Sequence, residues 1–124
     1  MIKRKGREGE TMETLIIVAI VALFVLWRMR TSKGIRSISA HQLKQELRDS
    51  DKVFIDVRTP AEFQARSIKQ FQNIPLGSDF SGLPKDKEIV VICRSGMRSA
   101  QACKQLKNMG YERVTNVRGG IGSY

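Results

Sequence analysis

The stretch from Lys87 to Ser99 constrains the fold more than any other part of the chain. It reads KEIVVICRSGMRS, an apolar β-branched run that ends in Cys93 and opens into a loop rich in glycine, serine and arginine. Such a run predicts a strand buried on both faces, as in a parallel sheet covered by helices. Ligands bind at the carboxyl ends of these strands, where the next helix directs its N-terminus. The stretch therefore predicts a reactive thiol in an anion-binding loop of an α/β domain.

Shorter apolar runs predict the strands that join this one in a sheet. They lie at residues 35–38, 53–55, 72–74 and 114–117. Helix signals separate several of them. Ser39 and Thr59 are each followed three residues later by glutamine or glutamate, which predicts capping boxes at two helix starts. A third helix is expected to begin at Met97 and to stop before Gly110.

The chain holds only two cysteines and one histidine, which limits its chemistry. Cys93 and Cys103 match neither a CxxC redox pair nor a zinc cluster, so we expect no metal site and no cofactor. One cysteine ends a strand and the other lies in the following helix, which favours reduced thiols and a cytosolic environment. We interpret Cys103 as a core residue and His41 as an ordinary helix residue.

The formal net charge of +10 indicates that the partners of the protein are anions. Its basic residues are dispersed, and the few aromatic residues are not interleaved with them, so we do not expect nucleic-acid binding. We attribute the charge to membrane flanks near the N-terminus and to a small-anion site around Cys93.

The N-terminal part contains a run of thirteen apolar residues, 15–27, with no amphipathic stripe. This is shorter than the ~20 residues of a usual membrane span. Met12 and Met29 extend the run, and the arginines behind it can snorkel, so we predict an uncleaved anchor. A removed signal peptide or an interfacial helix is the alternative. The predicted parts are a basic flexible N-terminus at 1–11, one transmembrane anchor helix at 12–30, a linker at 31–34 and the α/β domain at 35–124.

Orientation in the membrane is read from the charges that flank the anchor. The basic residues balance on the two sides, whereas Glu8, Glu10 and Glu13 lie only on the N-terminal side. This asymmetry, together with the expected need for a reduced thiol, favours a cytoplasmic C-terminal domain.

The loop after Cys93 has the features that make a thiol reactive. A free cysteine has a pKa near ~8.5, and the backbone N–H groups of residues 94–99 can converge on its sulfur and lower that value. The dipole of the next helix and the charges of Arg94 and Arg98 act in the same direction. The same donors could hold an anionic substrate or stabilise a persulfide, and neither role requires a general base.

A second group of polar residues follows the strand at 53–55. Asp56 and Arg58 are expected near the same crevice. We interpret them as supporting residues, with Asp56 accepting backbone hydrogen bonds and Arg58 pairing with Glu62 or Asp56.

Four motifs in order resemble the single-domain rhodanese-like family of thiosulfate sulfurtransferases. Residues 93–99, CRSGMRS, match the active loop C-R-x-G-x-R-S in full. Upstream, residues 56–63 are similar to D-V-R-x-P-x-E-F, and residues 73–76 are similar to N-I-P-L. Downstream, Gly119 and Gly120 resemble the glycine pair before the closing helix of the family.

The resemblance implies a rhodanese-like central parallel sheet flanked by helices and a persulfide on Cys93. Sulfur would pass from thiosulfate or a persulfide donor to a thiol or cyanide-like acceptor. Cys93 would be the catalytic residue. The implied substrate-binding residues are Arg94, Ser95, Gly96, Met97, Arg98 and Ser99.

Loop length separates this activity from that of related enzymes. Cys93 to Arg98 reads C-x4-R, the loop associated with sulfurtransferases, whereas the related phosphatases and arsenate reductases carry C-x5-R. The chain departs from the family at residues 66–71, which read RSIKQF in place of G-H-I-x-G-A. Two alternatives stay open, a membrane-anchored persulfide-sensing or protein-docking module with little turnover, and a phosphatase or arsenate reductase.

Overall fold

The computed structural model describes the backbone of residues 2–32 and 34–124, and the side chains of residues 11–27 and 34–124. The chain divides into two compact units, Met1–Lys33 and Gly34–Tyr124. Residues 1 and 33, which belong to the predicted N-terminal segment and linker, lie outside the described residues.

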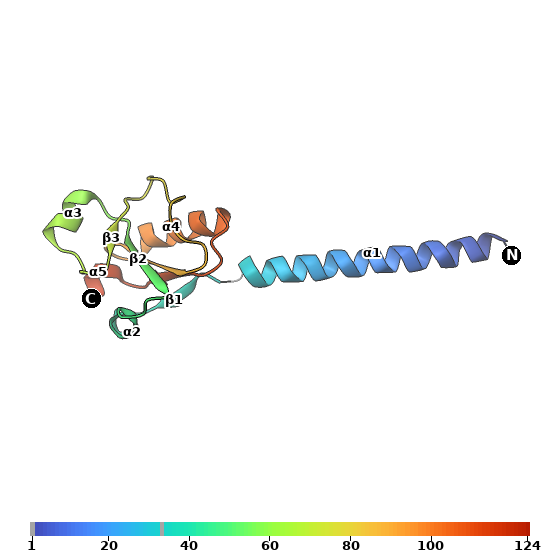
Figure 1. Cartoon of the computed structure of the whole chain (residues 1–124), viewed down its shortest axis with the longest axis horizontal. Helices are drawn as coiled ribbons and strands as arrows, with labels where there is room; N and C mark the ends of the chain where they lie inside the picture. The colour runs from blue at the N-terminus through green and yellow to red at the C-terminus, as the bar shows by residue number, and fades with distance from the viewer. Residues whose placement is uncertain (1, 33) are drawn as a thin grey trace. The chain divides into compact units, whose positions relative to one another are not determined.

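The first unit contains one helix, α1 (Ile2–Ser32), drawn in blue in Figure 1. The helix covers residues that the sequence assigned to a flexible segment and to a linker. No proline lies in this range to interrupt the backbone hydrogen bonds, so the helix continues past both ends of the apolar run. Among the residues described, no helix is both long and apolar enough to cross a membrane, so the predicted transmembrane helix is not supported.

The second unit is built on a five-stranded parallel sheet in the order β1-β5-β4-β2-β3. The strands are β1 (Arg36–Ile38), β2 (Lys52–Asp56), β3 (Gln72–Asn73), β4 (Glu88–Ile92) and β5 (Val114–Val117). The predicted parallel sheet is confirmed, and its strands differ from the expected ranges by at most two residues at an end. β4 lies at the centre of the sheet, which explains its continuous apolar sequence.

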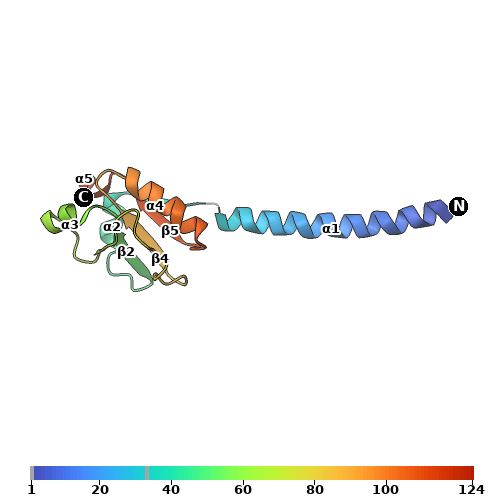
Figure 2. The same cartoon turned by 90° about the horizontal axis from the view of Figure 1, so that it is seen from above.

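Helices cover both faces of this sheet, as Figures 1 and 2 show. They are α2 (Ala40–Glu46), α3 (Pro60–Ala65), α4 (Met97–Asn108) and α5 (Gly120–Ser123). α4 packs on one face, and α2 and α5 contribute to the core on the other. Both predicted capping boxes form, with Ser39 accepting from the N–H of Gln42 and Thr59 from that of Glu62.

Successive side chains along β4 point to opposite faces of the sheet and contribute to the hydrophobic cores on both faces. Ile89, Val91 and Cys93 belong to the cluster under α4, whereas Val90 and Ile92 belong to the opposite cluster. All of these side chains are fully buried. The strand is therefore fixed from both sides, and it delivers the loop after Ile92 to the carboxyl edge of the sheet.

Candidate active site

Cys93 directly follows β4 and lies beneath the loop that leads into α4. Its Sγ accepts a hydrogen bond from the backbone N–H of Gly96 at 3.0 Å, and Ser99 Oγ lies 3.3 Å away. Gly96 has a φ of 103°, a left-handed conformation that glycine adopts without strain, and it forms the N-cap of α4. The predicted curl of the loop around the sulfur is therefore present, with the side chain of Cys93 fully buried.

The environment of Cys93 has two opposing effects on the acidity of its thiol. Burial raises the pKa, since it disfavours the charged thiolate. Hydrogen bonding to the Ser99 hydroxyl and to the backbone N–H groups of Ser99, Gly96 and Ser95 lowers it. The net pKa lies below the ordinary value for cysteine, which is the property that a sulfur nucleophile requires.

Ser99 is held by a residue that the sequence did not single out. Its hydroxyl donates to Asn116 Oδ1 at 2.5 Å, and the amide of Asn116 is oriented by a hydrogen bond from Nδ2 to the carbonyl oxygen of Gly96 at 3.4 Å. A hydroxyl carries one proton, so Ser99 can donate to Asn116 or to a thiolate at Cys93, but not to both. The signal that could have identified Asn116 is an amide inside the otherwise apolar and β-branched strand VTNV.

α5 holds the first residues of the loop through the backbone alone. The N–H groups of Ile121 and Gly122 donate to the carbonyl oxygens of Cys93 and Arg94 at 2.8 and 2.9 Å. Gly120 has a φ of 55°, and a Cβ at this position would overlap the backbone of Cys93 and Arg94. Gly120 is therefore needed for the close approach of α5 to the loop, and not only for a turn.

Arg98 faces a carboxylate in this structure. Its guanidinium donates to both carboxylate oxygens of Glu62, at 2.7 and 2.9 Å. This contact lowers the pKa of Glu62 to about 2, against a smaller opposing effect of desolvation. Arg98 lies in the loop, as expected, but it makes its ion pair with α3.

Asp56 and Arg58 form a buried pair at the end of β2. Arg58 Nη2 lies 2.8 Å from Asp56 Oδ2, and the backbone N–H of Arg58 donates to Asp56 Oδ1 at 3.0 Å. The same guanidinium donates to the carbonyl oxygens of Glu62 and Arg66, at the end of α3. The pair therefore connects the end of β2 to α3 beside the loop, and its supporting role stays a prediction.

The remaining loop residues differ in accessibility. Arg94, Ser95 and Met97 are exposed, with 81% of Met97 accessible, whereas Ser99 is buried. Cys103 lies in the core under α4, and burial raises its pKa to about 12. His41 is an exposed residue of α2, as expected. No cluster of three or more histidine, cysteine or carboxylate side chains in residues 11–27 and 34–124 is placed to hold a metal ion.

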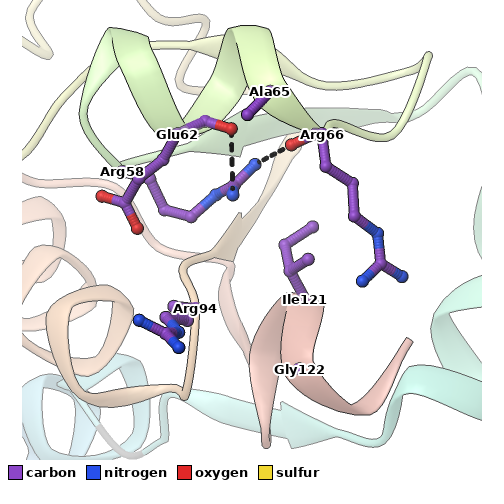
Figure 3. A pocket seen from close by; sticks show the side chains of 7 residues that line it. All are labelled: Arg58, Glu62, Ala65, Arg66, Arg94, Ile121 and Gly122. Carbon is purple, nitrogen blue, oxygen red and sulfur yellow. Dashed lines mark hydrogen bonds between the residues drawn. The ribbon is translucent and has the colours of Figure 1, made fainter.

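A cleft of about 380 Å³ adjoins the loop. Figure 3 shows Arg66 reaching into this space from the end of α3 and Arg94 from the loop after β4, with Ile121 between them in this view. The lining residues are Arg58, Glu62, Ala65, Arg66, Arg94, Ile121 and Gly122. The cleft thus combines positive charge with an apolar floor next to the cysteine loop.

Comparison with known proteins identifies relatives of most of the second unit. Residues 39–124 match the family described as the rhodanese-like domain. A sulfurtransferase of Allochromatium vinosum is 42% identical over 91 residues, which cover 70% of this chain and 85% of that protein. A tRNA uridine(34) hydroxylase of Escherichia fergusonii is 32% identical over 96 residues, but these cover only 27% of its length.

Solved structures give the same result for the fold. The crystal structure of a rhodanese-related protein from Thermoplasma volcanium superposes with a TM-score of 0.63 at 37% identity, over 71% of this chain and 88% of that one. A rhodanese-like domain protein from Staphylococcus aureus gives a TM-score of 0.65 at 29% identity, over 71% and 89% of the two chains.

Proposed function

Because the chain belongs to the rhodanese-like domain family, we propose that it is a sulfurtransferase in which Cys93 carries a sulfane sulfur atom as a persulfide. The convergence of backbone N–H groups on Cys93 Sγ is the observation that carries this proposal. These donors lower the pKa of the thiol. In a persulfide the negative charge lies on the outer sulfur, one bond beyond Sγ, and the same loop would surround that atom.

The reaction proceeds in two displacements at sulfur. In the first, the Cys93 thiolate attacks the outer sulfur of thiosulfate, a new S–S bond forms, and sulfite leaves with the electron pair of the old one. In the second, an acceptor such as a thiolate or cyanide attacks the outer sulfur, and Cys93 leaves as a thiolate. Neither step needs a general base, because both nucleophiles react in their deprotonated form.

Thiosulfate or a persulfide would serve as donor in this scheme. Arg94 directly follows Cys93 in the sequence and is exposed. Its guanidinium has no carboxylate partner among the described side chains, so it is available to an anion. Arg98 would contribute only if an anion competed with Glu62. Cys93 is fully buried, so the donor reaches Sγ only when part of the surrounding loop moves.

Mass spectrometry of the full chain after incubation with thiosulfate tests the proposal. We expect the added mass of one sulfur atom on the peptide that contains Cys93, its removal by a reducing thiol, and its transfer to cyanide as thiocyanate. A chain that gains no sulfur, or that gains it on Cys103, would refute the proposed function.

We further propose that residues 15–27 hold the protein at a lipid bilayer, with the second unit in the cytoplasm. The large apolar side chains from Met12 to Trp27 are 46–67% exposed on α1, and water penalises an apolar surface of this size. Basic residues flank the segment in the sequence, which suits anionic headgroups. A bilayer covers all sides of such a helix, whereas a single partner helix would cover one.

Flotation of the full chain with lipid vesicles tests this attachment. The protein should float with the vesicles, and the double variant Ile17→Lys, Val21→Lys should stay in the soluble fraction. Self-association of the unmodified chain without flotation would show that a second copy covers α1 and would overturn the proposal. A reporter fused after Tyr124 is expected to signal from the cytoplasm.

A further inference from the structure

The cleft beside the cysteine loop is larger than an inorganic sulfur anion requires. Its volume of about 380 Å³ lies in the range of sites that hold small organic ligands. Ala65 and Ile121 give it an apolar surface, which would suit a short carbon chain. The shape and lining therefore indicate a ligand with both a carbon skeleton and a negative charge.

The ion pairs around the cleft show which of its charged groups are free to bind such a ligand. Arg58 is neutralised by buried Asp56, and Glu62 is neutralised by Arg98. Arg66 and Arg94 have no carboxylate partner among the side chains of residues 11–27 and 34–124. Both residues line the cleft from different elements, on either side of Ile121 in Figure 3, and they leave it with positive charge.

We propose that Arg66 and Arg94 form a subsite for the carboxylate of an organic thiol that accepts sulfur from Cys93. A guanidinium presents paired N–H donors that match the two oxygens of a carboxylate. The carbon chain of the thiol lies against Ala65 and Ile121, and its sulfur points toward the loop. This inference rests on the proposed sulfurtransferase function and adds the chemical class of its acceptor.

The transfer step balances without any further reactant. The acceptor thiolate attacks the outer sulfur of the Cys93 persulfide, and a new S–S bond forms between the acceptor and that sulfur. The bond between the two persulfide sulfurs breaks, and its electron pair stays on Cys93, which leaves as a thiolate. The outer sulfur keeps its oxidation state, so no oxidant or reductant is consumed.

Arg66 is the residue that distinguishes this subsite in the sequence. It stands where the family pattern places a glycine, at the start of the segment RSIKQF. Its backbone carbonyl accepts from Arg58, which fixes the end of α3, while its side chain is exposed and free of that contact. The guanidinium can therefore be removed without loss of the interaction that positions the backbone.

Acceptor kinetics on preloaded protein test the subsite. The full chain is loaded with thiosulfate, excess donor is removed, and sulfur loss is followed with 3-mercaptopropionate, which carries a carboxylate, and with 2-mercaptoethanol, which does not. The quantity compared is the ratio of the two rate constants, because intrinsic thiol reactivity cancels between variants. In Arg66→Gln this ratio should fall about fivefold, the effect of one partly exposed charge pair.

Lys69→Gln is the matched control. Lys69 is exposed three residues further along, carries the same charge and does not line the cleft, so its ratio should equal that of the unmodified chain. Arg66→Lys should restore part of the preference, and added salt should weaken it. Normal loading with an unchanged ratio in Arg66→Gln, or an equal fall in Lys69→Gln, overturns the subsite alone. Failure of the chain to load sulfur overturns the proposed function together with the subsite.

Discussion

The two cysteines of this protein lie ten positions apart in the sequence, are both fully buried and belong to the same core cluster. Their thiols nevertheless differ in acidity. Burial raises the pKa of Cys103, in the middle of α4, to about 12, whereas the pKa of Cys93, at the end of β4, is lowered despite its burial. Burial alone therefore does not explain the difference in acidity between the two thiols.

The difference lies in the hydrogen-bond donors that surround each sulfur. Within α4 the backbone N–H groups bond to carbonyl oxygens of the preceding turn and are not available to Cys103. The N–H groups of Ser95 and Gly96 in the loop, and of Ser99 in the first turn of α4, are directed toward Cys93. An interrupted backbone thus creates the acidity that a regular helix cannot provide.

Replacing each cysteine in turn should give the largest difference in sulfur loading between two variants. Cys93→Ser keeps the shape of the loop but removes the nucleophile, so sulfur loading from thiosulfate should disappear. Cys103→Ala should load sulfur at the rate of the unmodified chain and lose only about 1 kcal/mol of unfolding free energy, because a small core cavity remains. Intact-mass measurement of loading and thermal unfolding check both variants. Retained loading in Cys93→Ser would contradict the contrast.

Gly120→Ala should disturb the loop without altering any side chain in it. The new Cβ would overlap the backbone of Cys93 and Arg94, and the positive φ of residue 120 adds strain. We expect a loss of about 2 kcal/mol of unfolding free energy or more, with slower alkylation of Cys93 by iodoacetamide at neutral pH.

Gly122→Ala is the control for Gly120→Ala. A Cβ at Gly122 would approach the carbonyl oxygen of Arg94 only to 3.1 Å, and the backbone there does not need a positive φ. This variant should be the milder of the two. If both variants lost the same unfolding free energy, the close contact of Gly120 with the backbone of Cys93 and Arg94 would have no special role.

Ser99→Ala should move the acidity of Cys93 toward that of Cys103. It removes the hydroxyl that can donate to a Cys93 thiolate in place of Asn116 and leaves the backbone donors in place, so the pKa of Cys93 should rise. Because a lowered pKa supplies thiolate at neutral pH, alkylation should become several-fold slower there and should recover as the pH rises. Ser99→Thr keeps the hydroxyl and should show the smaller change.

Glu62→Gln should have the smallest effect on this contrast. Glutamine retains the N-cap contacts of α3 but breaks the ion pair with Arg98. This ion pair is partly exposed, so it contributes no more than about 1 kcal/mol to the free energy of unfolding. The pH profile of Cys93 alkylation should shift little, since hydrogen bonding to Ser99, Gly96 and Ser95 lowers the pKa of Cys93 and stays in place in this variant. The lowered pKa of Glu62 means that the pair is lost only as the pH falls through about 2, so this pair should give no titration near neutrality.

A large pH shift in Glu62→Gln would show that local charge, and not the N–H groups, sets the acidity of Cys93. A decrease in KM for thiosulfate in the same variant would be consistent with the account, since Arg98 would then be free to bind the anion.

Much of the fold follows from local sequence patterns. The apolar run of β4, the two capping boxes and Gly110 after α4 each state a local preference that the tertiary structure satisfies. The position of Cys93 at the carboxyl end of the central strand was predicted for the same reason. The length of α1 was not predicted, because the charged residues at its ends permit a helix but do not require one.

The less predictable parts of the site depend on contacts between distant segments. Asn116 reaches Ser99 only because β5 lies beside β4, and Arg98 meets Glu62 only because Arg58 holds α3 in place. The sequence identified Arg98 as a charge in the loop but contained nothing that paired it with α3. Similarly, the cleft between Arg66 and Arg94 joins residues 28 positions apart.

The most direct test of the account is the pH dependence of alkylation at both cysteines in one sample of the full chain. Peptide mass spectrometry reports the labelled fraction of Cys93 and of Cys103 at each pH after brief exposure to iodoacetamide. We predict that Cys93 is labelled with a midpoint below the usual range for a free thiol, and that Cys103 stays unlabelled until strongly alkaline conditions or unfolding. Equal labelling of the two cysteines, or labelling of Cys103 first, would contradict the assignment of Cys93 as the sulfur carrier.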